Sequence, residues 1–290
     1  MPTQIRPRRT ALYMPASNVR AVEKARTLHC DVVILDLEDA VLPDAKETAR
    51  AAAAAAVKAG GFGRREVVIR VNSLDSIWGA HDLAAAVGAG PDAVLVPKIR
   101  SPGDIAAYDQ ALADAPPHTR LWAMIETPQA VLAIDAIAGV PSRLEALVMG
   151  INDLAKEIGA RQTPDRTPFH AAMTLTVIAA RANGLAVLDG VHNEIDDLAA
   201  LEAVCRQGAD FGFDGKTLIH PSHLGICNAA FTPTESEVTW SRAVIAAFDA
   251  PENAGKGALR VDGRLAELLH RDRARTLVAI ADAIVAAEAG

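Results

Sequence analysis

The sequence has few of the features that are typical of secreted proteins, of proteins stabilised by a structural metal, or of proteins that span a membrane. Its 290 residues include only three cysteines, Cys30, Cys205 and Cys227. Their odd number and wide spacing match no metal-binding pattern, and we interpret them as small buried side chains in a protein from a reducing compartment. No stretch approaches the roughly 20 consecutive apolar residues of a membrane span. The sequence therefore predicts no association with a membrane.

The chain also lacks an excess of basic charge. It has 29 basic and 36 acidic residues, a net charge of −7, and the acids are scattered rather than gathered in a tail. This balance does not favour nucleic acid as a partner. Several arginines near the N-terminus are followed by no apolar segment, so they do not form a secretion signal. We expect a cytoplasmic protein.

Hydrophobic residues make up 50% of the chain, enough for one large core. Eight short runs rich in Val, Ile and Leu alternate with Ala-rich helical stretches. The runs are apolar throughout rather than at every second position, which is typical of parallel strands that helices cover on both faces. Eight such units predict a (β/α)8 TIM barrel. The predicted strands are 10–16, 31–38, 66–72, 92–99, 120–126, 144–150, 185–191 and 210–219.

The pattern changes after Pro221, where only helices are predicted, near 222–230, 234–249 and 263–288. A loop of sequence "APENAGKGALRVDG" separates the last two, and its Gly, Asn and Pro content is typical of a mobile connection or a lid. We therefore predict a barrel domain over residues 1–230 and a C-terminal helical extension over 231–290.

In a TIM barrel the active site lies where the strands end, at their C-terminal edge. Polar residues of this sequence collect at those positions, next to Pro15 at the end of the first strand. They are Asp36, Glu38, Asp39, Arg70, Lys98, Glu126, Asn152, Asp153 and His220, among others.

Two of these residues suggest a metal site. Glu126 and Asp153 follow neighbouring strands, and two carboxylates can hold Mg²⁺ while leaving positions for water and for a ligand's own oxygens. Arg70 adds a guanidinium whose fork matches a carboxylate. The set predicts binding of small α-keto or 2-hydroxy acids.

The segment "DLEDAV" allows two interpretations. In a structural one, Asp39 caps the following loop and Glu38 pairs with a basic neighbour. In a functional one, Asp36, Glu38 and Asp39 form an acid/base cluster whose like charges raise a pKa, or an outer shell for metal-bound water. Both remain open. The segment "IHPSH" has no third ligand for zinc, so we expect His220 to orient its neighbours by hydrogen bonding.

Seven segments occur in the same order as in a known family. They are "RRTALYMPASNVR", "ILDLEDAV", "VIRVNSL", "VPKI", "AMIETPQAV", "LVMGINDLA" and "GKTLIHPSHL". Over roughly residues 8–230 the chain resembles the citrate lyase β-subunit-like proteins of the HpcH/HpaI aldolase superfamily, to which malyl-CoA and citramalyl-CoA lyases are related. The resemblance implies a TIM barrel, Mg²⁺ held by Glu126 and Asp153, and a homotrimer or hexamer in which the C-terminal extension packs on a neighbouring subunit.

The implied reaction is Mg²⁺-dependent cleavage or formation of a carbon–carbon bond in a 3-hydroxyacyl thioester, which yields an α-keto acid and an acyl thioester such as acetyl-CoA. One alternative is a citrate lyase β subunit, which acts on a thioester carried by an acyl carrier protein. Another is a barrel that binds keto acids or CoA without catalysis and has a regulatory role.

The resemblance also suggests roles for single residues. A C-terminal aspartate of the lyases corresponds to Glu267 in "GRLAE", where the longer side chain puts full lyase activity in question. CoA phosphates need basic partners, for which we consider Arg9, Arg20 and Lys24. The predicted catalytic residues are Arg70, Asp36, Glu38, Asp39 and Glu267, and the predicted substrate-binding residues are Arg70, Glu126, Asn152, Pro15 and His220.

Overall fold

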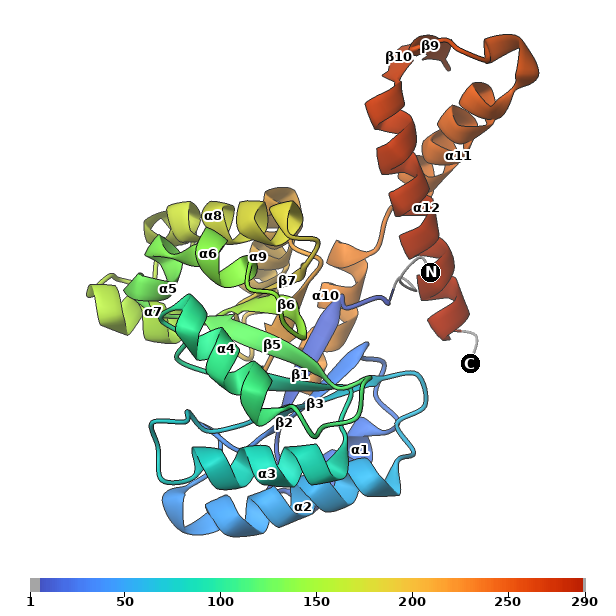
Figure 1. The fold of residues 1–290 in the computed structure, drawn as a ribbon. Helices are drawn as coiled ribbons and strands as arrows, with labels where there is room; N and C mark the ends of the chain where they lie inside the picture. The colour runs from blue at the N-terminus through green and yellow to red at the C-terminus, as the bar shows by residue number, and fades with distance from the viewer. Residues whose placement is uncertain (1–5, 289–290) are drawn as a thin grey trace. The chain divides into compact units, whose positions relative to one another are not determined.

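The computed structural model describes residues 6–288, of which Arg8–Phe231 form one compact unit. Eight parallel strands close into a barrel in chain order (Figure 1). This confirms the predicted (β/α)8 architecture. The strands are β1 (Thr10–Pro15), β2 (Val32–Asp36), β3 (Glu66–Arg70), β4 (Ala93–Val96), β5 (Arg120–Ile125), β6 (Leu144–Met149), β7 (Ala186–Asp189) and β8 (Gly215–Leu218).

Helices follow the strands and pack on the outside of the barrel. They are α1 (Val19–Ala25), α2 (Lys46–Ala59), α3 (Gly79–Ala89), α4 (Pro102–Ala111), α5 (Pro128–Leu132), α6 (Ile134–Ala138), α7 (Ile151–Ile158), α8 (His170–Ala182), α9 (Leu198–Phe211) and α10 (Leu224–Phe231). Short 3₁₀ helices lie at Pro43–Ala45, Thr167–Phe169 and Pro221–His223. Across residues 6–288 no helix is both long and apolar enough to cross a membrane.

The strands are apolar throughout because each one contributes to two cores. On β2, Val33 and Leu35 face the helices, whereas Val32 and Ile34 face the interior of the barrel. The interior core is filled by alternate residues of all strands except β8. Its members are Ala11, Val32, Ile34, Val68, Ala93, Leu95, Trp122, Met124, Ala146, Val148 and Leu188. The barrel is therefore solid below its C-terminal rim.

Charged residues close the opposite, N-terminal end of the barrel. The Arg8 guanidinium lies 5.0 Å from the Trp122 ring and pairs with Glu66 at 2.7 Å and Glu145 at 2.8 Å. Arg9 is buried there too, because its guanidinium pairs with Asp31 at 2.9 Å. The prediction that Arg9 binds CoA is therefore wrong: Arg9 precedes β1 and lies at the end of the barrel away from the rim.

The residues from Thr232 onward belong to a second unit, together with Arg6 and Pro7. This unit contains α11 (Glu235–Asp249), a 3₁₀ helix at Pro251–Asn253, β9 (Ala258–Val261), β10 (Arg264–Glu267) and α12 (Leu268–Glu288). The prediction of helices alone is wrong here, because β9 and β10 form an antiparallel hairpin. Asp262 and Gly263 turn it with φ of 47° and 81°. Asp-Gly between short apolar runs is a hairpin signal that the sequence analysis overlooked.

Replacing Arg8 with Met tests the N-terminal closure. The change removes the cation that pairs with Glu66, whose side chain is 2% exposed, and breaking a buried pair is strongly destabilising. We expect the free energy of unfolding, measured in urea, to fall by about 3 kcal/mol, and to fall less in Arg8→Lys. An unchanged urea midpoint for Arg8→Met would contradict this role.

Candidate active site

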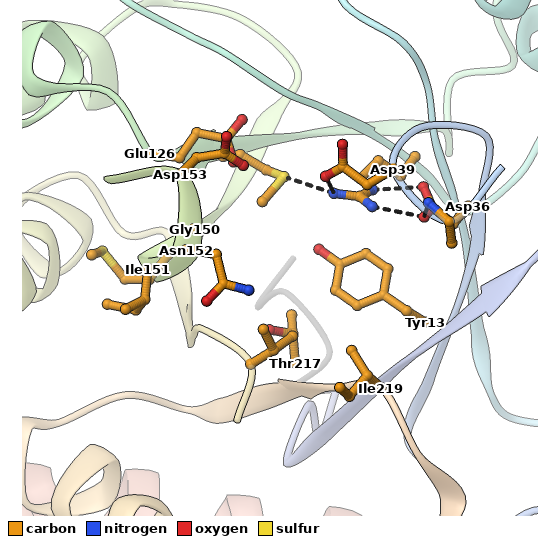
Figure 2. Close-up of a pocket in the computed structure, with 15 residues that line it drawn as sticks. Tyr13, Asp36, Asp39, Glu126, Gly150, Ile151, Asn152, Asp153, Thr217 and Ile219 are labelled. Atoms are coloured by element: carbon orange, nitrogen blue, oxygen red, sulfur yellow. Dashed lines mark hydrogen bonds and ion pairs between the residues drawn. The ribbon is translucent and has the colours of Figure 1, made fainter. Parts of the chain in front are cut away.

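A cavity of about 270 Å³ opens at the C-terminal rim of the barrel (Figure 2). Six of the predicted site residues line it. They are Asp36, Asp39, Arg70, Glu126, Asn152 and Asp153. Apolar side chains such as Met124, Met149 and Val191 complete the wall. The charged part of this lining thus coincides with residues predicted from the sequence, whereas the apolar lining follows only from the strand register.

Arg70, at the end of β3, is the centre of one charged cluster. Its Nε and Nη2 donate to the two Asp36 oxygens at 2.6 and 2.7 Å, a bidentate pair. Its Nη1 lies 2.8 Å from Glu38 and 3.4 Å from Asp39. The guanidinium fork that we assigned to a substrate carboxylate is therefore already engaged by Asp36. The contact of Nη1 with Asp39 is the longest of these, so Nη1 is the donor of Arg70 that is most available to a ligand.

Asp36 serves to position the loop that follows it. Besides the pair with Arg70, its carboxylate accepts hydrogen bonds from the backbone N–H groups of Glu38 and Ala40, at 2.9 and 3.1 Å. The buried ammonium of Lys46 donates to the carbonyl oxygens of Leu37 and Glu38. Because these hydrogen bonds hold the Asp36 carboxylate in place, it is poorly placed to act as a catalytic base. They support the structural interpretation of "DLEDAV" for this residue.

Glu38 is different, because burial raises its pKa to about 8. Arg70 opposes this rise in pKa, whereas the negative charges of Glu126 and Asp39 add to it. A carboxyl group with such a pKa exchanges its proton near neutral pH. The acid/base interpretation of the segment therefore suits Glu38, although Glu38 is not among the residues that line the cavity.

Glu126 and Asp153 face the other side of the pocket. Glu126 accepts a hydrogen bond from the backbone N–H of Lys98 through Oε1 at 2.7 Å, whereas its Oε2 is buried and has no partner among residues 6–288. Burial raises the pKa of Glu126, against the effect of the Lys98 charge. A Cβ atom at position 150 would lie 2.5 Å from Glu126 Oε2, so Gly150 makes room for this carboxylate.

Lys98 joins the two carboxylates, a role that the sequence analysis did not assign. Its Nζ lies 2.5 Å from Asp153 Oδ1 and 3.6 Å from Glu126 Oε1. Burial opposes its charge, yet the two acids raise the pKa of Lys98 above its ordinary value. Its φ of 57° is a left-handed conformation that costs a residue with a side chain about 1–3 kcal/mol. The available signal was "VPK" at the C-terminal end of the predicted strand 92–99.

The donors present fit Mg²⁺. The Oε2 of Glu126 has no partner among residues 6–288. The carboxylate of Asp153 contacts the ammonium of Lys98, which shows that it can pair with a positive charge. No cluster of three His, Cys, Asp or Glu residues suited to a metal occurs within residues 6–288. Mg²⁺ does not need three such protein ligands, because it keeps several bound waters and uses one or two protein carboxylates. Glu126 and Asp153 would hold it.

The other predicted site residues are not among those that line this pocket. Pro15 and His220 are not among the lining residues, and His220 Nδ1 instead contacts the Ser222 hydroxyl at 2.7 Å. Arg20 and Lys24 lie on the exposed side of α1. Glu267 belongs to the second unit, at the end of β10. The structure thus brings together the acids and Arg70, whereas Pro15, His220, Arg20 and Lys24 are not among the residues that line this pocket.

The raised pKa of Glu38 predicts how stability depends on pH. A carboxyl group whose pKa rises from 4.5 to about 8 on folding contributes stability that is complete below pH 4.5 and is lost as the pH rises toward 8. Glu38→Gln cannot titrate. We expect the free energy of unfolding of the wild type to fall relative to Glu38→Gln as the pH rises through this range, measured in urea. Parallel pH profiles would contradict the raised pKa.

Replacing Lys98 with Met tests whether its ammonium competes for the metal site. Because Lys98 neutralises Asp153, we expect Mg²⁺ to bind Lys98→Met about tenfold more tightly than the wild type, a difference of about 1.4 kcal/mol. Isothermal titration calorimetry with Mg²⁺ measures this. Lys98→Arg is the control, because it keeps the charge. Equal affinities of the two variants would show that Lys98 does not compete.

The profile of the family described as HpcH/HpaI aldolase/citrate lyase matches residues 9–221. The chain is 46% identical over 286 residues to a (3S)-malyl-CoA thioesterase of Cereibacter sphaeroides, with 99% of both chains covered. It is 31% identical to an L-malyl-CoA/β-methylmalyl-CoA lyase of the same organism, with 97% of this chain and 96% of the lyase covered.

Among solved structures, a CitE protein of Mycobacterium tuberculosis in complex with magnesium, acetoacetate and coenzyme A is similar to this chain. The TM-score is 0.78 at 28% identity, and the match covers 95% of this chain and 98% of the CitE chain. The family resemblance seen in the sequence motifs is thereby confirmed, and with it a relationship to enzymes of CoA thioesters. The chain belongs to the HpcH/HpaI aldolase/citrate lyase family.

Proposed function

We propose that this protein is a Mg²⁺-dependent enzyme that hydrolyses the CoA thioester of a short 3-hydroxy dicarboxylic acid of the malyl-CoA type. The observation that carries the proposal is Glu126, which lines the cavity beside Asp153 and whose buried Oε2 has no partner among residues 6–288. The 46% identity to a (3S)-malyl-CoA thioesterase over nearly the whole chain favours hydrolysis over other reactions of CoA thioesters.

The size of the cavity suits the acid end of such a substrate. Its volume of about 270 Å³ is at the lower limit of ligand pockets, so it accommodates the short acid head while the nucleotide of CoA stays outside the barrel. Mg²⁺ between Glu126 and Asp153 would polarise the hydroxyl and carboxylate oxygens of this head and orient it. Arg20 and Lys24 remain candidates for the CoA phosphates.

Asp39 is the acid best placed to accept a proton during hydrolysis. Its side chain is 65% exposed and lines the pocket, and its contact with Arg70 is long, at 3.4 Å. In the proposed step Asp39 removes a proton from the water that attacks the thioester carbonyl carbon. The carbon–sulfur bond of the resulting tetrahedral adduct then breaks, and the proton held by Asp39 passes to the CoA thiolate as it leaves. Arg70 holds Asp39 beside the reaction and is itself held by Asp36.

Carbon–carbon cleavage is the second candidate, because of the raised pKa of Glu38. A carboxyl group that titrates near pH 8 suits removal of a hydroxyl proton, the step that starts cleavage of a 3-hydroxyacyl thioester. The relative at 31% identity is a lyase. In this reaction Glu267 of a neighbouring subunit would act in a homotrimer or hexamer, with the C-terminal extension packed on that neighbour.

One assay separates the two reactions. Hydrolysis of (3S)-malyl-CoA releases the CoA thiol and malate, whereas carbon–carbon cleavage releases glyoxylate and leaves the thioester intact as acetyl-CoA. We expect thiol release, followed with a thiol reagent, without glyoxylate, and we expect EDTA to abolish it. Asp39→Asn should lower the rate about a hundredfold or more because it removes a general base.

The contrary outcomes are distinct. Glyoxylate without free thiol would establish the lyase. Turnover of neither kind, with (S)-malate still bound in the presence of Mg²⁺, would point to a carrier-protein thioester or to a regulatory barrel. Glu126→Gln is the control for the metal site, and full activity of this variant would refute the assignment of Glu126.

A further inference from the structure

Tyr13 carries a hydroxyl group that the fold does not use. Its side chain lies on the inner face of β1, against the interior core, and forms part of the cavity wall. The Arg70 guanidinium carbon is 4.7 Å from the centre of its ring. The hydroxyl oxygen is buried and has no hydrogen-bond partner among residues 6–288. In Figure 2 this oxygen points toward the space between Asp39 and Asp153.

An unpartnered hydroxyl in this position is unfavourable for the protein alone. Burial of a hydroxyl without a hydrogen bond costs about 1–3 kcal/mol. A phenylalanine ring would fill the same space and stack on Arg70 in the same way, without this cost. The oxygen of Tyr13 therefore has no structural use among the contacts of residues 6–288, and a ligand in the cavity can supply its partner.

The surroundings of Tyr13 make its hydroxyl a hydrogen-bond donor. Burial raises its pKa, and the negative charges of Asp36 and Glu126 add to the rise against the effect of Arg70. The group therefore stays a neutral phenol. The carboxylates around it only accept hydrogen bonds when ionised, and Asp36 and Glu38 engage most donors of Arg70. Tyr13 thus supplies a donor that is free for an anionic ligand.

We propose that the Tyr13 hydroxyl donates a hydrogen bond to a carboxylate oxygen of the acid head, and so selects CoA thioesters of dicarboxylic acids over those of monocarboxylic acids. This inference rests on the proposed function and adds the specificity-determining residue. A thioester that carries a methyl group in place of the carboxylate leaves the buried hydroxyl unpaired, and a site built for a hydrogen bond discriminates against such an analogue.

Tyr13→Phe tests the proposal, with (S)-malate and Mg²⁺ as the probe. We expect the variant to bind (S)-malate at least tenfold more weakly in calorimetry, because the lost hydrogen bond is to a charged group. Without ligand, the variant should unfold at a higher temperature than the wild type. The preference in kcat/KM for (3S)-malyl-CoA over 3-hydroxybutyryl-CoA should fall tenfold or more.

The other tyrosine of the chain provides the matched control. The Tyr108 hydroxyl accepts a hydrogen bond from the backbone N–H of Leu74 at 3.0 Å and lies outside the lining of the pocket. Tyr108→Phe loses a structural bond, so it should unfold at a lower temperature and bind (S)-malate like the wild type. A higher unfolding temperature for Tyr13→Phe and a lower one for Tyr108→Phe would show that the Tyr13 hydroxyl serves ligand binding, whereas the Tyr108 hydroxyl stabilises the fold.

Each remaining outcome decides the matter. Equal binding of (S)-malate by Tyr13→Phe and the wild type, with unchanged selectivity, overturns the role of Tyr13 and leaves the proposed function intact. A lower unfolding temperature of Tyr13→Phe shows a structural partner and also overturns it. A wild type that neither binds (S)-malate nor turns over malyl-CoA refutes the proposed function, and this inference with it.

Discussion

The balance of charge at the C-terminal rim is the constraint on which the rest of the site depends. Five carboxyl groups meet there, from Asp36, Glu38, Asp39, Glu126 and Asp153, and a low-dielectric barrel cannot hold so much negative charge without compensation. Arg70 compensates the first three and Lys98 the last two. The remaining imbalance is taken up by protonation, as the raised pKa values of Glu38 and Glu126 show, or by a bound cation.

The barrel supports this arrangement from below. Apolar side chains fill its interior up to Tyr13 and Met124, and the Arg8 pair with Glu66 closes the far end, so the pocket is short and ends on a solid floor. A floor of packed apolar side chains has a low dielectric constant, which strengthens electrostatic interactions beside it. The Tyr13 hydroxyl has no hydrogen-bond partner among residues 6–288, and Tyr13 lines this confined space, so its donor bears on the choice of ligand.

Much of this could be predicted from the sequence, because its physical causes are local. Runs of Val, Ile and Leu mark the strands, and the acids follow them directly. Because the C-terminal ends of barrel strands meet at one rim, this is enough to predict that Glu126 lies beside Asp153. The same rule should have placed Arg9 at the far end. The hairpin after Ala258 had its Asp-Gly signal. The sequence placed Lys98 at the end of a strand, but its contacts with the two carboxylates and the unused hydroxyl of Tyr13 could not be predicted, since they depend on a backbone dihedral angle and on which polar atoms find partners after folding.

The central claim is that Glu126 and Asp153 form a cation site over which the acid head of a thioester lies. A crystal structure with Mn²⁺ in place of Mg²⁺ and with (S)-malate tests it most directly, because Mn²⁺ is located by its anomalous scattering. The account predicts one Mn²⁺ between the two carboxylates, Lys98 displaced from Asp153, and a malate carboxylate within hydrogen-bond distance of the Tyr13 hydroxyl. Mn²⁺ bound elsewhere, with Lys98 still paired to Asp153, would contradict it.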